Sequence, residues 1–171
     1  VVTYGYRSFR VDAETGFYLN GKSLPLHGVA RHQDRLDKGW AISKADHEED
    51  VALIKELGAN TIRLAHYQHD QYFYELCNRT GFVLWAEIPF ISQFIPTQEA
   101  YNNTISQMTE LVAQNYNHPA IMFWGISNEI LIGDDREDLR QNLRDLHELA
   151  KSMDPSRLTT MAQVSMTPMD S

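Results

Sequence analysis

Five short apolar runs alternate with four helix-like patterns along most of the 171-residue chain. The runs are nearly continuous in apolar residues, which is typical of strands buried on both faces in a parallel sheet. The expected strands are residues 24–29, 61–66, 82–87, 121–129 and 157–164. Regular alternation of this kind predicts an α/β fold, either a (β/α)8 TIM barrel or a doubly wound sheet.

The first strand-to-helix connection favours the barrel. Residues 27–40 read HGVARHQDRLDKGW and are polar and rich in histidine and arginine. A doubly wound nucleotide-binding protein would carry a glycine-rich phosphate loop at this place. A complete barrel needs about 250 residues, so we expect a barrel truncated to about five β/α units by a cut after residue 171.

Capping signals place the ends of the helices. Ser43 and Asp46 have the spacing of a capping box, and Asp70 and Thr97 are expected N-caps. Gly81 is expected to end the second helix, and the fourth is expected to begin near Arg136.

A strand over residues 4–11 and an Asn20-Gly21 hairpin turn are expected before the barrel. We therefore assign residues 1–22 to a strand and hairpin that lead into the barrel domain. Residues 23–171 are assigned to the amino-terminal part of a TIM-barrel domain.

Composition excludes several classes of function. The net charge of −8 argues against a nucleic-acid partner, and no apolar run has the length of a membrane helix. The single cysteine, Cys77, is expected to be a buried and inert thiol. Neither end resembles a natural terminus and no signal peptide is present, so we expect a piece of a longer protein from the bacterial cytoplasm or periplasm.

Polar side chains recur where each of the first four strands ends. In α/β folds the carboxyl ends of the strands form the working face, so these side chains are expected to meet at one rim. They are Arg31, His32 and Asp34, then Arg63 and His66, then Trp85 and Glu87, and finally Asn128 and Glu129. Arg35, Asp37 and His69 are expected to be solvated loop residues.

The chemistry at this rim is that of a carbohydrate site. No spacing specifies a metal site and no Gly-x-Ser-x-Gly motif appears, so neither a metal nor a cofactor is expected. Trp85 and Trp124 are expected to offer flat faces for sugar rings, while amides and carboxylates bind hydroxyl groups. A carbohydrate is therefore the expected partner.

Four segments resemble, in order and spacing, the catalytic barrel of glycoside hydrolase family 2, the family of β-galactosidases, β-glucuronidases and β-mannosidases. They are LPLHGVARHQD, LGANTIRLAHYQHD, LCNRTGFVLWAEIPF and NYNHPAIMFWGISNEI. The segment YGYRSFRVD…FYLNGK, within residues 1–22, resembles the strand and hairpin by which a preceding β-sandwich domain enters that barrel. The resemblance implies that Glu129 is the general acid/base and that Asn128 binds the sugar 2-hydroxyl. It further implies that His32, His66 and Glu87 line the site and that Arg63 supports the carboxylates.

The resemblance implies a retaining, exo-acting β-galactosidase whose nucleophilic glutamate, on the seventh strand, lies outside this chain. β-Glucuronidase and β-mannosidase of the same family are alternatives, and a non-catalytic sugar-binding or scaffold module is another. A magnesium-binding Glu-x-His pair known in some β-galactosidases is absent after Glu87. The isolated chain is expected to be inactive and to form homo-oligomers through exposed barrel edges.

Overall fold

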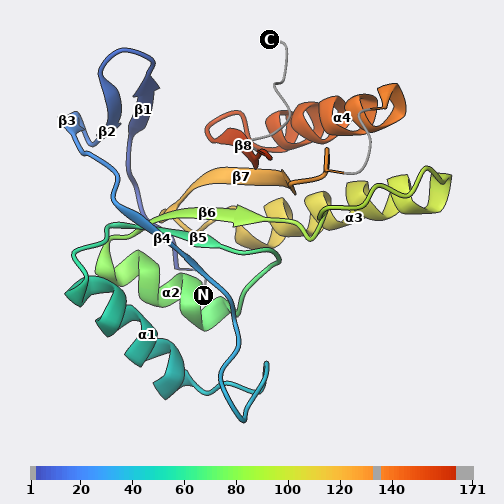
Figure 1. Cartoon of the computed structure of the whole chain (residues 1–171). Helices are drawn as coiled ribbons and strands as arrows, with labels where there is room; N and C mark the ends of the chain where they lie inside the picture. Colours follow the sequence, from blue (N-terminus) through green and yellow to red (C-terminus); the bar gives the residue numbers. More distant parts are fainter. Residues whose placement is uncertain (1–2, 133–135, 165–171) are drawn as a thin grey trace. The chain divides into compact units, whose positions relative to one another are not determined.

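The computed structural model describes residues 3–132 and 136–164 and has the alternating α/β architecture that the sequence predicts (Figure 1). Five strands form one sheet, in the order β4-β5-β6-β7-β8. They are β4 (Gly28–Arg31), β5 (Thr61–Leu64), β6 (Val83–Glu87), β7 (Ile121–Asn128) and β8 (Leu158–Ala162). The pairs β4–β5 and β7–β8 are parallel, which confirms the predicted fold class.

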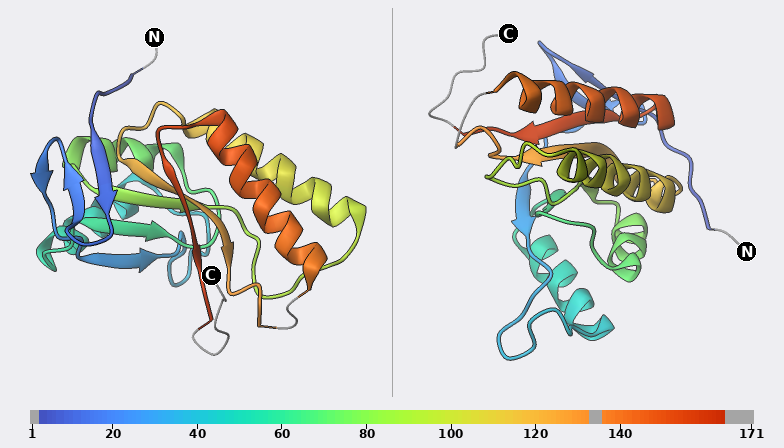
Figure 2. Two further views of the ribbon diagram at one scale, coloured as in Figure 1. Left: turned by 90° about the horizontal axis from the view of Figure 1, so that it is seen from above. Right: turned by 90° about the vertical axis from the view of Figure 1, so that its right-hand side faces the viewer.

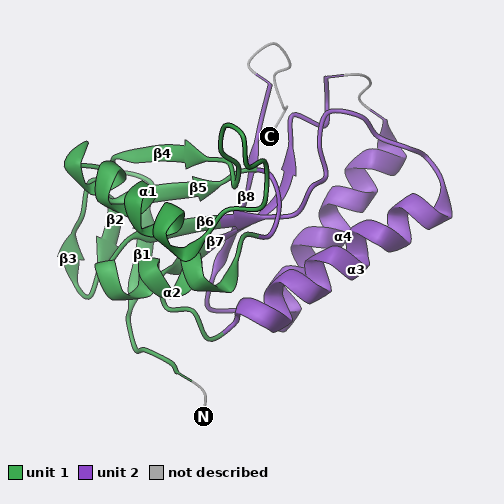
Figure 3. Cartoon of the chain, turned by 90° about the horizontal axis from the view of Figure 1, so that it is seen from below, with its two compact units in different colours: residues 1–65, 69–85, 117–122 green, residues 66–68, 86–116, 123–171 purple. Residues whose placement is uncertain are grey.

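Four helices connect these strands: α1 (Lys44–Glu56), α2 (Gln71–Thr80), α3 (Gln98–Asn115) and α4 (Glu137–Met153). The chain divides into two compact units (Figure 3). Unit 1 consists of residues 1–65, 69–85 and 117–122, and unit 2 consists of residues 66–68, 86–116 and 123–171.

The helix caps confirm the expected boundaries. Ser43 and Asp46 form the capping box of α1, Asp70 and Thr97 cap α2 and α3, and Gly81 ends α2 with a left-handed φ of 81°. No helix in the described part of the chain combines the length and the apolar character needed to cross a membrane. Cys77 is fully buried, and burial raises the pKa of its thiol to about 12.

The amino-terminal segment is a three-stranded antiparallel sheet of β1 (Phe9–Asp12), β2 (Gly16–Leu19) and β3 (Lys22–Ser23). The Asn20-Gly21 turn is confirmed, and its φ values of 50° and 79° suit a tight hairpin. The first strand begins at residue 9, not 4, and a second turn follows it. The Asp12 carboxylate accepts hydrogen bonds from the backbone of Glu14 and Thr15 in that turn, a local signal that the sequence analysis missed.

The expected strand over residues 24–29 is displaced to Gly28–Arg31. Pro25 has no N–H to donate, and Leu24 donates its own N–H to Phe17 of the hairpin. The backbone therefore joins the parallel sheet only after His27. The His27 N–H donates a hydrogen bond to the side-chain oxygen of Asn60 at 2.9 Å.

In unit 2, α3 and α4 lie side by side in both views of Figure 2. Tyr101 donates its hydroxyl to Asp145 at 2.9 Å, and Asn142 donates to the Thr104 hydroxyl at 3.0 Å. These polar bridges fix the register of two helices that also bury leucine side chains such as Leu139 and Leu146.

A buried arginine organises unit 1. The Arg31 guanidinium donates to Asp50 at 2.7 Å and contacts Nδ1 of His47 at 2.9 Å and Nδ1 of His69 at 3.1 Å. Its Cζ lies 3.9 Å from the centroid of the Phe73 ring. His69 is therefore a buried core residue, and the expectation of a solvated loop residue is wrong. The loop before α2 packs against Arg31, which is distant in sequence, and this contact buries His69.

A guanidinium can only donate hydrogen bonds, so both histidines accept at Nδ1 and are neutral. Burial, followed by the nearby charge of Arg31, lowers the pKa of His69 to about 3, although a hydrogen bond to the Ala65 carbonyl opposes the shift. Burial also lowers the pKa of His47.

We predict that the free energy of unfolding falls as the pH is lowered from about 6.5 toward about 4. In this range the unfolded chain protonates His69 and the folded chain does not, so stability decreases by up to about 1.4 kcal/mol per pH unit for each such proton. Urea denaturation at several pH values measures the slope. His69→Gln should flatten it, whereas the exposed control His27→Gln should keep it. Equal slopes in all three proteins would contradict this assignment.

Candidate active site

Asn128 and Glu129 stand at the carboxyl end of β7, where the pairing with β8 is irregular. Gly125 lies opposite Thr160 and Asn128 lies opposite Ala162, so β7 uses three residues where β8 uses two. A bulge of this kind moves the following side chain to the other face of the strand. Asn128 therefore shares the face of Gly125 and not that of Trp124.

Glu129 has a φ of 51°, in the left-handed region that residues with a Cβ rarely adopt. Its N–H donates to the Ala162 carbonyl at 2.9 Å, which stabilises this conformation. The strand ends here, and the Glu129 side chain is exposed while Asn128 before it is buried. The carboxylate that ends an apolar strand is thus not an unpaired charge in the core.

The segment after β6 continues beside the end of β7. Asn128 donates its N–H to the Phe90 carbonyl at 2.8 Å and accepts from the Ser92 N–H at 3.0 Å. Ile91 forms a parallel bridge with Asn128, and Ser92 has a φ of 55°. The sequence predicts no strand at these residues, because a single bridge leaves no periodic pattern.

Glu87 and His66 form a hydrogen-bonded pair of side chains in unit 2. Oε1 of Glu87 lies 2.7 Å from Nδ1 of His66, and the Glu87 side chain is fully buried while that of His66 is 24% exposed. Ile88, the residue after Glu87, donates its N–H to Gly125 of β7 at 3.3 Å. Unit 2 therefore brings His66 and Glu87 to the strand end that carries Asn128 and Glu129.

The other three expected site residues belong to unit 1. The Arg63 Cζ lies 4.6 Å from the centroid of the Trp85 ring, and the Trp85 Nε1 is a buried atom without a hydrogen-bond partner among the described residues. One face of Trp85 is thus in contact with a cation. His32 is exposed in the loop that follows β4.

Trp124 is a core residue, and the expectation that it stacks on sugar rings is wrong. Its side chain is fully buried, and its Nε1 donates to Asp154 at 3.0 Å. The Arg157 guanidinium donates to the same carboxylate and lies 5.2 Å from the Trp124 ring. An indole enclosed in this way cannot contact a ligand.

Within the described residues no three His, Cys, Asp or Glu side chains are grouped so that they could hold a metal ion. In unit 2, two carboxylates, an amide and an imidazole thus lie at or near the ends of β6 and β7, whereas the Arg63–Trp85 pair and His32 belong to unit 1. A carboxylate presented beside an amide is suited to protonating a leaving oxygen while the amide binds a neighbouring hydroxyl.

Comparisons with known proteins agree with this chemistry. The family model "Glycosyl hydrolases family 2, TIM barrel domain" matches residues 10–170. A β-glucuronidase of Bacteroides fragilis is 46% identical over 166 residues, which cover 92% of this chain and 24% of the relative. A β-galactosidase of Thermoanaerobacterium thermosulfurigenes is 31% identical over 159 residues, covering 91% of this chain and 21% of the relative.

A solved structure of an FMN-binding β-glucuronidase from Facaelibacterium prausnitzii L2-6 is 56% identical, with a TM-score of 0.95, over 96% of this chain and 26% of the other. The chain thus spans about a quarter of the length of these relatives. The family model covers nearly the whole chain, and the predicted strands and helices are those of the first part of a barrel. The chain therefore belongs to glycosyl hydrolase family 2 and carries part of its TIM barrel domain.

Proposed function

We propose that the full-length protein containing this chain is a retaining β-glucuronidase that removes terminal β-D-glucuronic acid. The observation that carries the proposal is the Asn128-Glu129 pair, turned out of β7 by a bulge and a left-handed backbone. The buried Glu87–His66 pair in the same unit supports it. The nucleophile lies in a part of the protein outside this chain.

Glu129 acts first as the acid that protonates the glycosidic oxygen. A second carboxylate, about 5–5.5 Å away in retaining enzymes, attacks the anomeric carbon and forms a glycosyl-enzyme. Glu129 then removes a proton from the water that releases the sugar. Its exposed side chain suits both steps, because it must reach a leaving group and later a water molecule.

The neighbouring residues orient the sugar. Asn128 supplies an amide for the 2-hydroxyl, and His66 donates Nδ1–H to Glu87, so that its Nε2 edge is directed away from the carboxylate. We further propose that His32, Arg63 and Trp85 contact the substrate, as the family resemblance of their segments implies; they lie after or on β4, β5 and β6.

The identity of the sugar is drawn from the relatives. The 46% and 56% identical proteins are named β-glucuronidases, whereas the named β-galactosidase is 31% identical. We therefore favour a β-glucuronide over the β-galactoside expected from sequence, and over a β-mannoside.

We predict that Glu129→Ala in the full-length protein lowers turnover of alkyl glycosides by about 10²–10⁴-fold. Turnover of nitrophenyl glycosides should fall far less, because nitrophenolate needs little protonation to leave. Azide should restore activity and yield a glycosyl azide. Steady-state kinetics and product analysis measure both effects, with the exposed Glu148→Ala as the control. Equal losses on both substrates, with no azide product, would refute the role of Glu129.

We predict that kcat/KM for 4-nitrophenyl β-D-glucuronide exceeds that for the β-D-galactoside by at least about 100-fold. A site that pairs the C6 carboxylate leaves polar groups unsatisfied when that carboxylate is missing. Both substrates have the same leaving group, so the ratio reports recognition of the sugar alone. A ratio that favours the galactoside or the mannoside would overturn the choice of sugar but not the role of Glu129.

We further propose that the full-length protein binds FMN, because the 56% identical relative is described as FMN-binding. The purified protein should then quench flavin fluorescence at equimolar concentration and retain FMN through gel filtration. Riboflavin, which lacks the phosphate, is the matched control ligand. No quenching at micromolar protein and FMN would reject this proposal without affecting the hydrolase assignment.

A further inference from the structure

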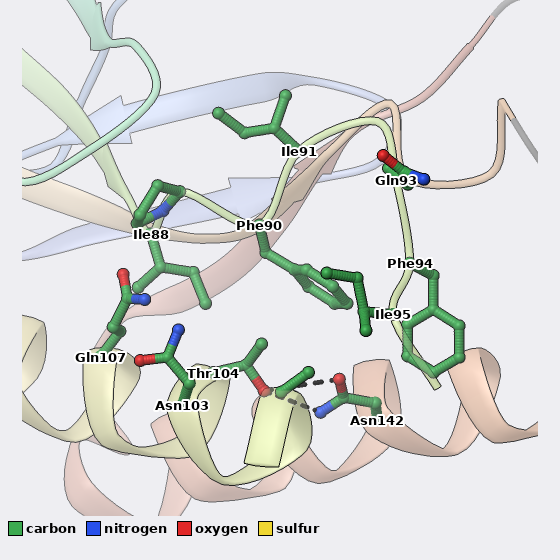
Figure 4. Close-up of a pocket in the computed structure, with 12 residues that line it drawn as sticks. Ile88, Phe90, Ile91, Gln93, Phe94, Ile95, Asn103, Thr104, Gln107 and Asn142 are labelled. Atoms are coloured by element: carbon green, nitrogen blue, oxygen red, sulfur yellow. Dashed lines mark hydrogen bonds between the residues drawn. The ribbon is translucent and has the colours of Figure 1, made fainter. Parts of the chain in front are cut away.

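A cavity of about 150 Å³ lies in unit 2 between the segment that follows β6 and the helices α3 and α4 (Figure 4). Segment 88–95 forms one wall, α3 forms the second, and Asn142 of α4 closes the far side. This cavity is not used in the proposed hydrolysis.

Two carboxamides of α3 line the cavity, and both are accessible to water, since Asn103 is exposed and Gln107 is half-buried. Asn103 and Gln107 are four residues apart on α3, so they lie on the same face of the helix, and their amides reach toward the opposite wall in Figure 4. Within the described residues neither side chain has a hydrogen-bond partner. Each amide offers two donors and one acceptor, so a ligand between them could form several hydrogen bonds at once.

Gln93, on the segment opposite α3, adds a third neutral carboxamide to the lining, and the other two polar side chains are paired. Asn142 and Thr104 hydrogen-bond to each other. No Lys, Arg, His, Asp or Glu lines the cavity. A carboxylate or phosphate bound here would lose water without gaining a counter-charge, which is unfavourable. The ligand must therefore be neutral.

The rest of the lining is apolar and partly aromatic. The Phe90 and Phe94 rings lie 6.3 Å apart in an edge-to-face arrangement, and Ile88 and Ile95 also line the cavity. A cavity of about 150 Å³ is known to hold one benzene-sized ring. A six-membered ring with an apolar face therefore fits this cavity.

We propose that this cavity binds a neutral pyranose ring, either a free sugar or a sugar unit of a larger ligand. A phenol has a single hydroxyl and can satisfy only one of the two amides. A pyranose carries hydroxyls around its rim and C–H groups on its faces, so it can pair with both amides while it packs on Phe90 or Phe94. This inference does not depend on the proposed hydrolysis of glucuronides.

The position of the cavity links it to the catalytic strand. The Phe90 side chain lines the cavity, while its carbonyl accepts the Asn128 N–H at 2.8 Å. Segment 90–92 thus has the cavity on one side and the end of β7 on the other. A ring that packs against Phe90 and displaces its backbone is therefore expected to change the position of Asn128.

The test uses the full-length protein with ¹³C-labelled isoleucine δ1 methyl groups. Titration with glucose, galactose and xylose should shift the Ile88 and Ile95 signals saturably, with Kd in the millimolar range, and leave Ile54 of α1 unchanged. Glucuronate and phenol should not shift them. Ile95 is the decisive signal, because Ile88 follows Glu87 and can also respond to a sugar bound at the catalytic site.

Asn103→Leu and Gln107→Leu should each raise Kd about threefold to tenfold, as expected for the loss of hydrogen bonds to neutral groups. Asn102→Leu is the matched control, since Asn102 is exposed on the same helix and does not line the cavity. The proposal fails if no neutral sugar shifts Ile95, if both leucine variants bind like the parent, or if phenol alone binds. The titration of the parent protein decides the question even if a variant does not fold.

Discussion

The Arg31 guanidinium is the contact on which unit 1 most depends. It is buried, and it joins the end of β4 to α1 through Asp50 and His47 and to the loop before α2 through His69. A buried cation is stable only when its donors are satisfied. The two histidines must therefore remain neutral. The same contacts tie the end of β4 to α1 and to His69, all within unit 1.

In unit 2 the corresponding constraint is the irregular end of β7. One extra residue turns Asn128 away from the face of Trp124, and a left-handed φ of 51° turns Glu129 out of the strand. Backbone bonds to Phe90, Ser92 and Ala162 hold this arrangement. Strained conformations of this kind persist where neighbouring structure over-determines them, and they often mark functional sites. The amide and the carboxylate are thus positioned by backbone geometry before any substrate arrives.

The same geometry explains why the family is clear and the sugar is not. In the proposed mechanism, the Glu129 carboxylate and the Asn128 amide act on parts of the substrate that glucuronides, galactosides and mannosides all contain. The residues that read C6 are not identified by these motifs. The motifs therefore do not specify the β-galactoside that was expected from the sequence. The names of the relatives favour a β-glucuronide.

Local patterns in the sequence determined the helix caps, the Asn20-Gly21 turn, the strand and helix order and the Asn128-Glu129 motif, because each depends on residues within a few positions of one another. Only the tertiary structure decided that His69 and Trp124 are core residues, that β4 starts at Gly28, and that a cavity lies beside α3. Burial and register depend on which distant segment covers a residue. His69 is buried by Arg31, 38 positions away, and Trp124 by Asp154, 30 positions away. Periodicity carries no information about such partners.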